Sequence, residues 1–199
     1  MYIVYKIGHV LSAAEEALRG RKGFLDAYTP PLTDGFAWKN WVAELDHKTC
    51  VSCKEKHGEI YAWDESPTPN PPLHDHCRCE IKPVQALVSG TGSKDGKNGA
   101  DWWIKHRGTL PDYYLSKGDF ESLGWVPGKS PAKYAPDKMM TAGIYQNRNK
   151  HLPDAPGRIW QEADLNYYEG RRNKHRLVWS NDGLMFVTYD HYETFHEII

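Results

Sequence analysis

The sequence has no cysteine outside residues 50–79, although four lie within that segment. A disulfide therefore cannot stabilise the C-terminal half, where about 100 residues must form a core without one. The sequence also lacks an apolar run of the roughly 20 residues that cross a bilayer, so we expect no membrane-spanning helix and no membrane partner. Its net charge is only −1, which excludes a global positive field that would attract nucleic acid.

The region before residue 50 gives few signals of function. Its first ten residues lack the pattern of a secretory signal, so we expect no signal peptide. The capping-box spacing from Ser12 predicts a short helix that ends at Gly20 or Gly23. Trp38 and Trp41 have the spacing of one helical face, and we expect both to pack in a core.

Cysteine and histidine residues lie in two groups, one on each side of a proline-rich loop. The first group is Cys50-Val51-Ser52-Cys53, and the second is His74-Asp75-His76-Cys77-Arg78-Cys79. Thiolates and imidazoles at this spacing can hold one tetrahedral zinc ion, and the site would be structural because protein ligands fill every position. The candidate ligand sets are Cys50, Cys53, His74 and Cys77, or Cys50, Cys53, Cys77 and Cys79. The short gap between the last two cysteines favours the set with His74, and disulfides or free thiols are the alternatives.

Several residues around these groups keep the order of a known family. They are Trp41, Asp46, Thr49, Cys50-x-x-Cys53, His57-Gly58, the proline-rich loop and His74-x-x-Cys77-Arg78-Cys79. This pattern resembles the C-terminal part of phage head-morphogenesis (Mu protein F-like) minor capsid proteins. The resemblance covers residues 38–83 and implies a module that joins a phage particle or an export route, with phage particle proteins as partners.

Glycine, serine and lysine dominate the segment that follows this region. It contains Ser-Gly-Thr-Gly-Ser and Lys-Asp-Gly-Lys-Asn-Gly, a composition typical of flexible linkers. We therefore predict three parts: a phage-like module at 1–83, a linker at 84–98, and a second domain at 99–199.

Alternating hydrophobicity marks three strands in this second domain. The stretch 157–167 alternates, and it places Glu162 and Asp164 on the same face. Two further runs, 176–180 and 184–188, meet across an Asp-Gly turn, which is the strongest short-range signal of a β-hairpin.

Helices are expected before this sheet. Residues 101–106 favour a short helix, and Ser116 caps a second one that should end at Gly124. Prolines and a glycine predict a loop over 127–140. Helices followed by an antiparallel sheet indicate the α+β class.

A carboxylate, arginines and a histidine on this sheet suit cleavage of a phosphodiester. RNA cleavage without a metal needs a base for the 2′-hydroxyl, an acid for the leaving 5′-oxygen, and cations near the phosphorus. Glu162 suits the base and His191 the acid, while Arg172 and Arg176 offer forked donors for phosphate oxygens. Taken singly, each has a plain alternative: a solvated glutamate, a surface histidine, or arginines that pair with nearby carboxylates.

Many short motifs here keep the order and spacing of one family. They are Leu110-Pro111-Asp112, Leu123-Gly124-Trp125-Val126, Asn147-Arg148, Gly157-Arg158, Glu162-Ala163-Asp164, Asn166-Tyr167, Arg172-Asn173 and Asp190-His191-Tyr192. They resemble the barnase-like, guanyl-specific ribonucleases, which are small secreted bacterial enzymes. The resemblance covers 99–199 and implies a catalytic base, acid and phosphate-binding arginines at the positions named above, a lysine at Lys117 and a tyrosine at Tyr192. It also implies catalysis without a cofactor, an RNA substrate, a barstar-like inhibitor protein and an extracellular location.

The base-recognition loop departs from this family. It matches Gln146, Asn147, Arg148 and Asn149, but the family has a glutamate at the last position. A carboxylate accepts both guanine N–H groups, whereas an amide offers one acceptor and brings its own donors. A family aspartate is also replaced by Gly143. We expect weaker guanine selectivity and retained cleavage.

Two functions of different classes follow. The first is an endoribonuclease toxin on a phage-derived module, which cleaves single-stranded RNA through a 2′,3′-cyclic phosphate. The second is a structural phage minor head protein with an inactive or RNA-binding C-terminal domain. Joint retention of Glu162, Arg172, Arg176 and His191 favours the first.

Overall fold

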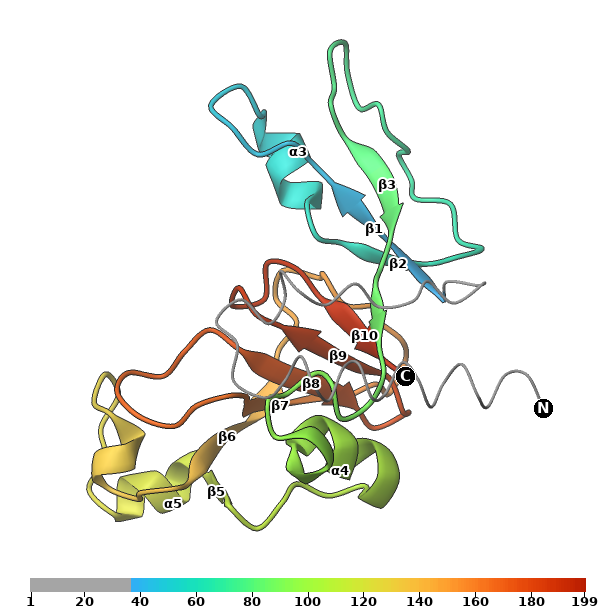
Figure 1. Cartoon of the computed structure of the whole chain (residues 1–199). Helices are drawn as coiled ribbons and strands as arrows, with labels where there is room; N and C mark the ends of the chain where they lie inside the picture. Colours follow the sequence, from blue (N-terminus) through green and yellow to red (C-terminus); the bar gives the residue numbers. More distant parts are fainter. Residues whose placement is uncertain (1–36) are drawn as a thin grey trace, which may run out of the picture.

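The computed structural model describes residues 37–199, which form two β-sheets with short helices (Figure 1). The smaller sheet is antiparallel, in the order β2-β1-β3. Its strands are β1 (Trp38–Val42), β2 (Ile60–Ala62) and β3 (Glu80–Pro83), and helix α3 (Val51–Lys56) lies between the first two along the chain. The helix expected near Ser12 falls outside the described residues.

The larger sheet has seven strands in the order β4-β10-β9-β8-β7-β6-β5. Their bounds are β4 (Ala86–Leu87), β5 (Tyr114–Ser116), β6 (Met139–Tyr145), β7 (Trp160–Asp164), β8 (Arg176–Ser180), β9 (Met185–Thr188) and β10 (His196–Ile198). The five central strands pair antiparallel, as expected, but each outermost strand pairs parallel with its neighbour. The α+β class is therefore confirmed, whereas a purely antiparallel sheet is not.

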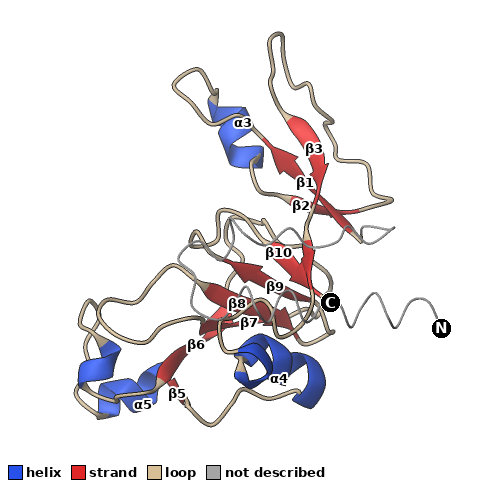
Figure 2. Cartoon of the chain, in the orientation of Figure 1, coloured by secondary structure: helices blue, strands red, loops and turns tan. Residues whose placement is uncertain are grey.

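Short helices precede most of the large sheet in the chain (Figure 2). They are α4 (Ala100–Arg107), α5 (Lys117–Ser122) and the 3₁₀ turns η1 (Gly96–Asn98) and η2 (Pro131–Lys133). The cap predicted at Ser116 is present and takes the form of a capping box, because Ser116 accepts from the Asp119 N–H and Asp119 accepts from the Ser116 N–H. The predicted hairpin is also present, since β8 and β9 pair antiparallel through a turn at Gly183, whose φ is +96°. No helix among residues 37–199 is long and apolar enough to cross a bilayer.

The segment 84–98, which its composition marks as a linker, is instead packed against the large sheet. Its strand β4 lies beside β10, and the turns that follow bury Thr91 and Ser93. The carboxylate of Asp101, itself fully buried, accepts from the Gly90 and Gly92 N–H groups and from the Ser93 hydroxyl. The glycines therefore serve tight turns around a buried acceptor, and the boundaries of the three predicted parts remain a proposal.

One buried cluster joins the two sheets. Ile60 of β2 and Val84, which directly follows β3, pack with Trp160 and Phe186 of the larger sheet. Trp38 packs against this cluster, whereas Trp41 is fully buried. The expectation that these two tryptophans share a helical face is wrong, because both lie in β1, where residues three apart point to opposite faces.

Candidate functional site

The centre of the large sheet carries the predicted carboxylate on β7. Glu162 and Asp164 lie two residues apart in this strand and so face the same side of the sheet. Glu162 is half-buried, while Asp164 is completely buried. The two carboxylates therefore have different environments, and only the first is accessible to a ligand.

Asp164 holds the two predicted phosphate-binding arginines. Arg172 donates to it from Nε (2.7 Å) and Nη2 (2.6 Å), in a two-point pair. Arg176 Nε lies 3.1 Å from Oδ1, within ion-pair range but out of line for a hydrogen bond. Burial, the largest single influence, lowers the pKa of Arg172, but the hydrogen bonds and negative charge of Asp164, together with nearby Glu162, raise that pKa overall. Sequence reasoning named Asp164 only as a candidate ion-pair partner, because its burial is a tertiary property.

Arg176 is almost fully buried, with only 4% of its surface exposed. Its Nη1 donates to the carbonyls of Asn173 (2.8 Å) and His175 (2.6 Å). These bonds fix the guanidinium group of Arg176 in a buried position, where it places a positive charge beneath the site. Arg172 is the more accessible cation.

Tyr192 connects the loop after β9 to the carboxylate on β7. Its hydroxyl donates to Glu162 Oε2 at 2.5 Å, and its ring stacks on Tyr145 with centroids 5.0 Å apart. Burial, and next the bond to Glu162, raise the pKa of Tyr192, so the hydroxyl remains protonated and donates. The His191 ring lies 4.8 Å from the Tyr192 ring.

His191 and Tyr192 both have left-handed backbones, with φ of +70° and +71°. Asp190 supports this turn by accepting from the N–H groups of Glu193 (3.1 Å) and Thr194 (3.0 Å). Two adjacent non-glycine residues in this region carry strain and persist only where such contacts hold them.

The charges around His191 oppose one another. Burial lowers the pKa of His191, and the positive charge of Arg176 lowers it further, while the Glu162 carboxylate counteracts both. The Glu162 carboxylate therefore acts on the imidazole through its charge. The structure brings together Glu162, Arg172, Arg176, His191 and Tyr192, as the sequence predicts for one site.

The base-recognition loop follows β6. Asn147, with φ of +44°, turns inward: its Nδ2 donates to the Leu152 carbonyl (2.8 Å), and its Oδ1 accepts from the Leu152 N–H (3.1 Å). This side chain therefore shapes the loop, whereas Gln146 and Arg148 are exposed.

Asn149 is exposed, but its side chain makes hydrogen bonds within the protein. Its Oδ1 accepts from the Tyr145 hydroxyl (3.2 Å), and its Nδ2 donates to the Tyr192 carbonyl (3.1 Å). Gly143 lies at a β-bulge between β6 and β7 with φ of +86°, and its missing side chain leaves open space.

Lys117 is the first residue of α5, directly after the edge strand β5 of the same sheet. Ser116 pairs with Thr141, which pairs with Ala163, so the backbone near Lys117 is two strand spacings, about 10 Å, from β7. Its ammonium pairs with Glu121 at 3.5 Å, and both side chains are about half exposed. Lys117 therefore borders the cluster rather than contacting it.

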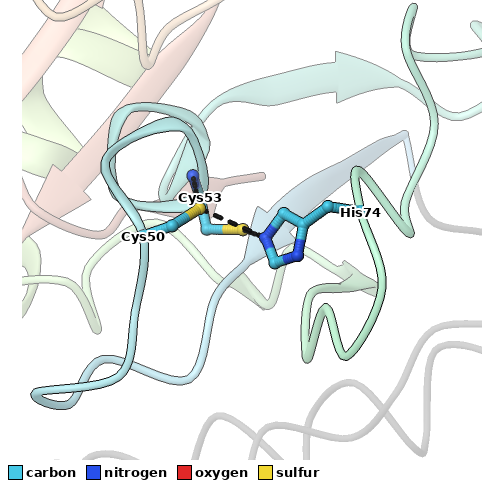
Figure 3. Close-up of side chains that lie close together, drawn as sticks. All are labelled: Cys50, Cys53 and His74. Atoms are coloured by element: carbon cyan, nitrogen blue, oxygen red, sulfur yellow. Dashed lines mark hydrogen bonds between the residues drawn. The ribbon is translucent and has the colours of Figure 1, made fainter.

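The cysteine and histidine groups meet at the tip of the smaller sheet (Figure 3). His74 Nε2 lies 3.2 Å from Cys50 Sγ and 3.3 Å from Cys53 Sγ, and Cys53 Sγ lies 3.7 Å from Cys77 Sγ. In a tetrahedron with zinc–sulfur bonds of about 2.3 Å, neighbouring sulfurs are about 3.8 Å apart, so these residues fit a zinc ion. None of the four cysteines is joined in a disulfide. Cys79 groups with Cys53 and Cys77, so among residues 37–199 three ligands of each predicted set lie together, but no complete set of four does.

Comparison with known proteins agrees with both halves of the chain. A model of the ribonuclease family matches residues 98–199. The chain belongs to the ribonuclease family. A second model, phage Mu protein F like protein, matches residues 33–82. Both resemblances drawn from the sequence are therefore confirmed.

Ribonucleases of three bacteria are similar to this chain. Those of Heyndrickxia coagulans, Bacillus intermedius and Bacillus pumilus are each 46% identical to it over 100 residues, which is 50% of this chain. The match spans 91% of the Heyndrickxia protein but 61% of each Bacillus protein. The ribonuclease family thus accounts for the half of the chain that carries Glu162 and His191.

Proposed function

We propose that this ribonuclease-family chain is an endoribonuclease that cleaves single-stranded RNA by transesterification without a metal. The supporting observation is that Glu162 and His191 both contact Tyr192, in a site where Arg176 supplies a buried positive charge. A carboxylate and an imidazole so arranged can flank one phosphoryl group.

In the first step, the Glu162 carboxylate takes the proton of the ribose 2′-hydroxyl, and the 2′-oxygen attacks phosphorus. The P–O5′ bond breaks as protonated His191 gives its proton to the leaving 5′-oxygen. The products are a 2′,3′-cyclic phosphate end and a 5′-hydroxyl end, with Glu162 protonated and His191 neutral. Arg172 and Arg176 stabilise the negative charge that gathers on the phosphoryl oxygens, and Lys117 adds to this field from the border.

Base selection in this proposal is weaker than guanine-specific recognition. Asn149 stands where the family has a glutamate, and its amide already bonds with Tyr145 and Tyr192. It offers a base at most one acceptor, whereas a carboxylate offers two. The exposed Gln146 and Arg148 side chains, together with the loop backbone shaped by Asn147, remain as contacts for the base.

The test is incubation of the full chain with a mixed-sequence RNA in excess EDTA. We expect products that end in 2′,3′-cyclic phosphate, at sites not restricted to guanosine. An Asn149→Glu variant is the control for selectivity, and it should shift cleavage toward guanosine. An inactive wild type would reject the proposal, and activity lost in EDTA that Mg²⁺ but not Zn²⁺ restores would reject metal independence.

The biological role we propose is that of a toxin carried by a phage-derived module. The N-terminal match to the phage Mu protein F like family supports an association with phage particle proteins or an export route. A cell that makes such an enzyme needs protection, which points to a barstar-like inhibitor partner and to action outside the producing cell. The alternative, a structural minor head protein with an inactive C-terminal domain, predicts no cleavage in the EDTA assay.

We also propose that the Cys/His cluster holds one structural zinc ion. The thiol and imidazole spacings support it, and a hydrogen bond from the Leu73 backbone lowers the pKa of Cys77 to about 7, toward the thiolate that binds metal. We expect about one zinc per chain in freshly purified protein by elemental analysis, and a lower content in Cys53→Ser. Zinc-free wild type whose thiols react equally with and without chelator would contradict this assignment.

A further inference from the structure

The smaller sheet docks beside the base-recognition loop. The Ile60 N–H, at the start of β2, donates to the His151 carbonyl at 2.8 Å. Next to this bond, Ile60 packs in the same buried cluster as Leu152, the residue that Asn147 holds. Trp38 Nε1 donates to Glu197 on β10 at 3.1 Å. The docking is therefore both polar and apolar: the contacts of Ile60 fall on the proposed base-recognition loop, and that of Trp38 falls on β10.

His151 links this loop to the loop that carries the catalytic histidine. Its Nδ1 lies 3.0 Å from the Tyr192 carbonyl and 3.0 Å from Asn149 Nδ2. Burial lowers the pKa of His151, so the ring is neutral near pH 7. A protonated Nδ1 donates to the carbonyl, and an unprotonated one accepts from the amide, so either tautomer has a partner.

Gly58 allows the smaller sheet to come this close. Its φ is +90°, and a β-carbon added there would lie 2.6 Å from the Glu193 carbonyl oxygen and 2.9 Å from His151 Nδ1. Glycine at this position thus touches both loops of the site at once, and any side chain would push them away.

We propose that the module formed by β1, α3, β2 and β3 positions the ribonuclease site, with His151 as the positioning residue between its recognition loop and its catalytic loop. The proposal rests on the ribonuclease function proposed above. Its physical basis is the strained pair His191–Tyr192, whose positive φ angles persist only where surrounding contacts hold them. His151 and Asn149 supply those contacts at the Tyr192 carbonyl, and the module holds His151 in turn.

Paired glycine variants of the full chain test the docking. Gly58→Ala should lower kcat on a short RNA substrate by about fivefold to tenfold, because it drives β2 away from both loops. Gly128→Ala is the matched control: its φ is +87°, nearly that of Gly58, but nothing lies within 4 Å of an added β-carbon. It bears the same backbone strain and should remain within about twofold of wild type. Equal kcat values for the two variants would overturn the proposal.

Two variants of His151 separate positioning from packing, and they apply even if Gly58→Ala does not fold. His151→Phe keeps the ring without Nδ1 and should lower kcat about tenfold with little change in KM. His151→Asn places an amide near the Nδ1 position and should recover most of that loss. Unchanged kcat in the phenylalanine variant, or equal losses in both variants with equal falls in Tm, overturns the inference. If the wild type cleaves RNA and the variants are equally active, only this inference is rejected. If the wild type is inactive, the proposed function is rejected as well.

Discussion

Replacement of His191 by alanine is expected to lower kcat for RNA cleavage about a thousandfold, the usual size of a general-acid contribution. The 5′-oxygen would then leave without a proton, while binding of RNA to Arg172 persists. The His191 side chain is mostly exposed, with only partial burial against the Tyr192 ring, so the variant should keep a Tm close to that of the wild type. Steady-state kinetics with a dinucleoside substrate measure the effect.

Glu162→Gln should cause a loss of similar size, and the double variant should lose little more, because base and acid act in one step. The pH profile provides a second check. Burial and Arg176 lower the pKa of His191, so kcat/KM of the free enzyme should fall as pH rises through a value below about 6.5. A His191→Ala variant as active as wild type would remove His191 from the mechanism.

Replacement of Asp164 by asparagine is expected to lower the free energy of unfolding by about 3–5 kcal/mol. The carboxylate is completely buried and pairs with two guanidinium groups, of which that of Arg176 is 5% exposed. An amide would leave those charges buried without compensation. Urea denaturation followed by tryptophan fluorescence measures the change.

Glu121→Gln is the control for this prediction. It removes an ion pair with Lys117 in which both side chains are about half exposed, and solvent screens such pairs. The unfolding midpoint should not move. If Asp164→Asn left the midpoint equally unmoved, the buried pair would not be a stabilising element of the site.

Local sequence patterns predicted the elements whose conformation depends mainly on their own residues. The alternation of β7, the hairpin of β8 and β9, and the capped start of α5 all appear as expected. Strand β6 was not predicted, because a bulge at Gly143 interrupts its register. The two-residue strand β4 exists only through its pairing with β10, so its own sequence carries no strand signal.

The candidate site was likewise predicted only in part from the sequence. Resemblance to a family indicated which side chains to examine, including Glu162, Arg172 and His191. It could not show that Asp164 is buried, that Asn147 turns inward, or that His151 joins two loops, because those facts depend on packing between distant segments. Composition predicted a flexible linker over 84–98, but glycine and serine occur in tight turns as well as in flexible chains.

The pairing of β4 with β10 has a practical consequence for shortened versions of this enzyme. Glu197 and Ile199 donate to the carbonyls of Gln85 and Leu87, so residues ahead of the matched ribonuclease segment cover the last strand. A protein cut at residue 98 would present that strand as an open edge with unpaired amides, a template for association between copies. A shortened version that keeps this edge covered has to begin before Gln85.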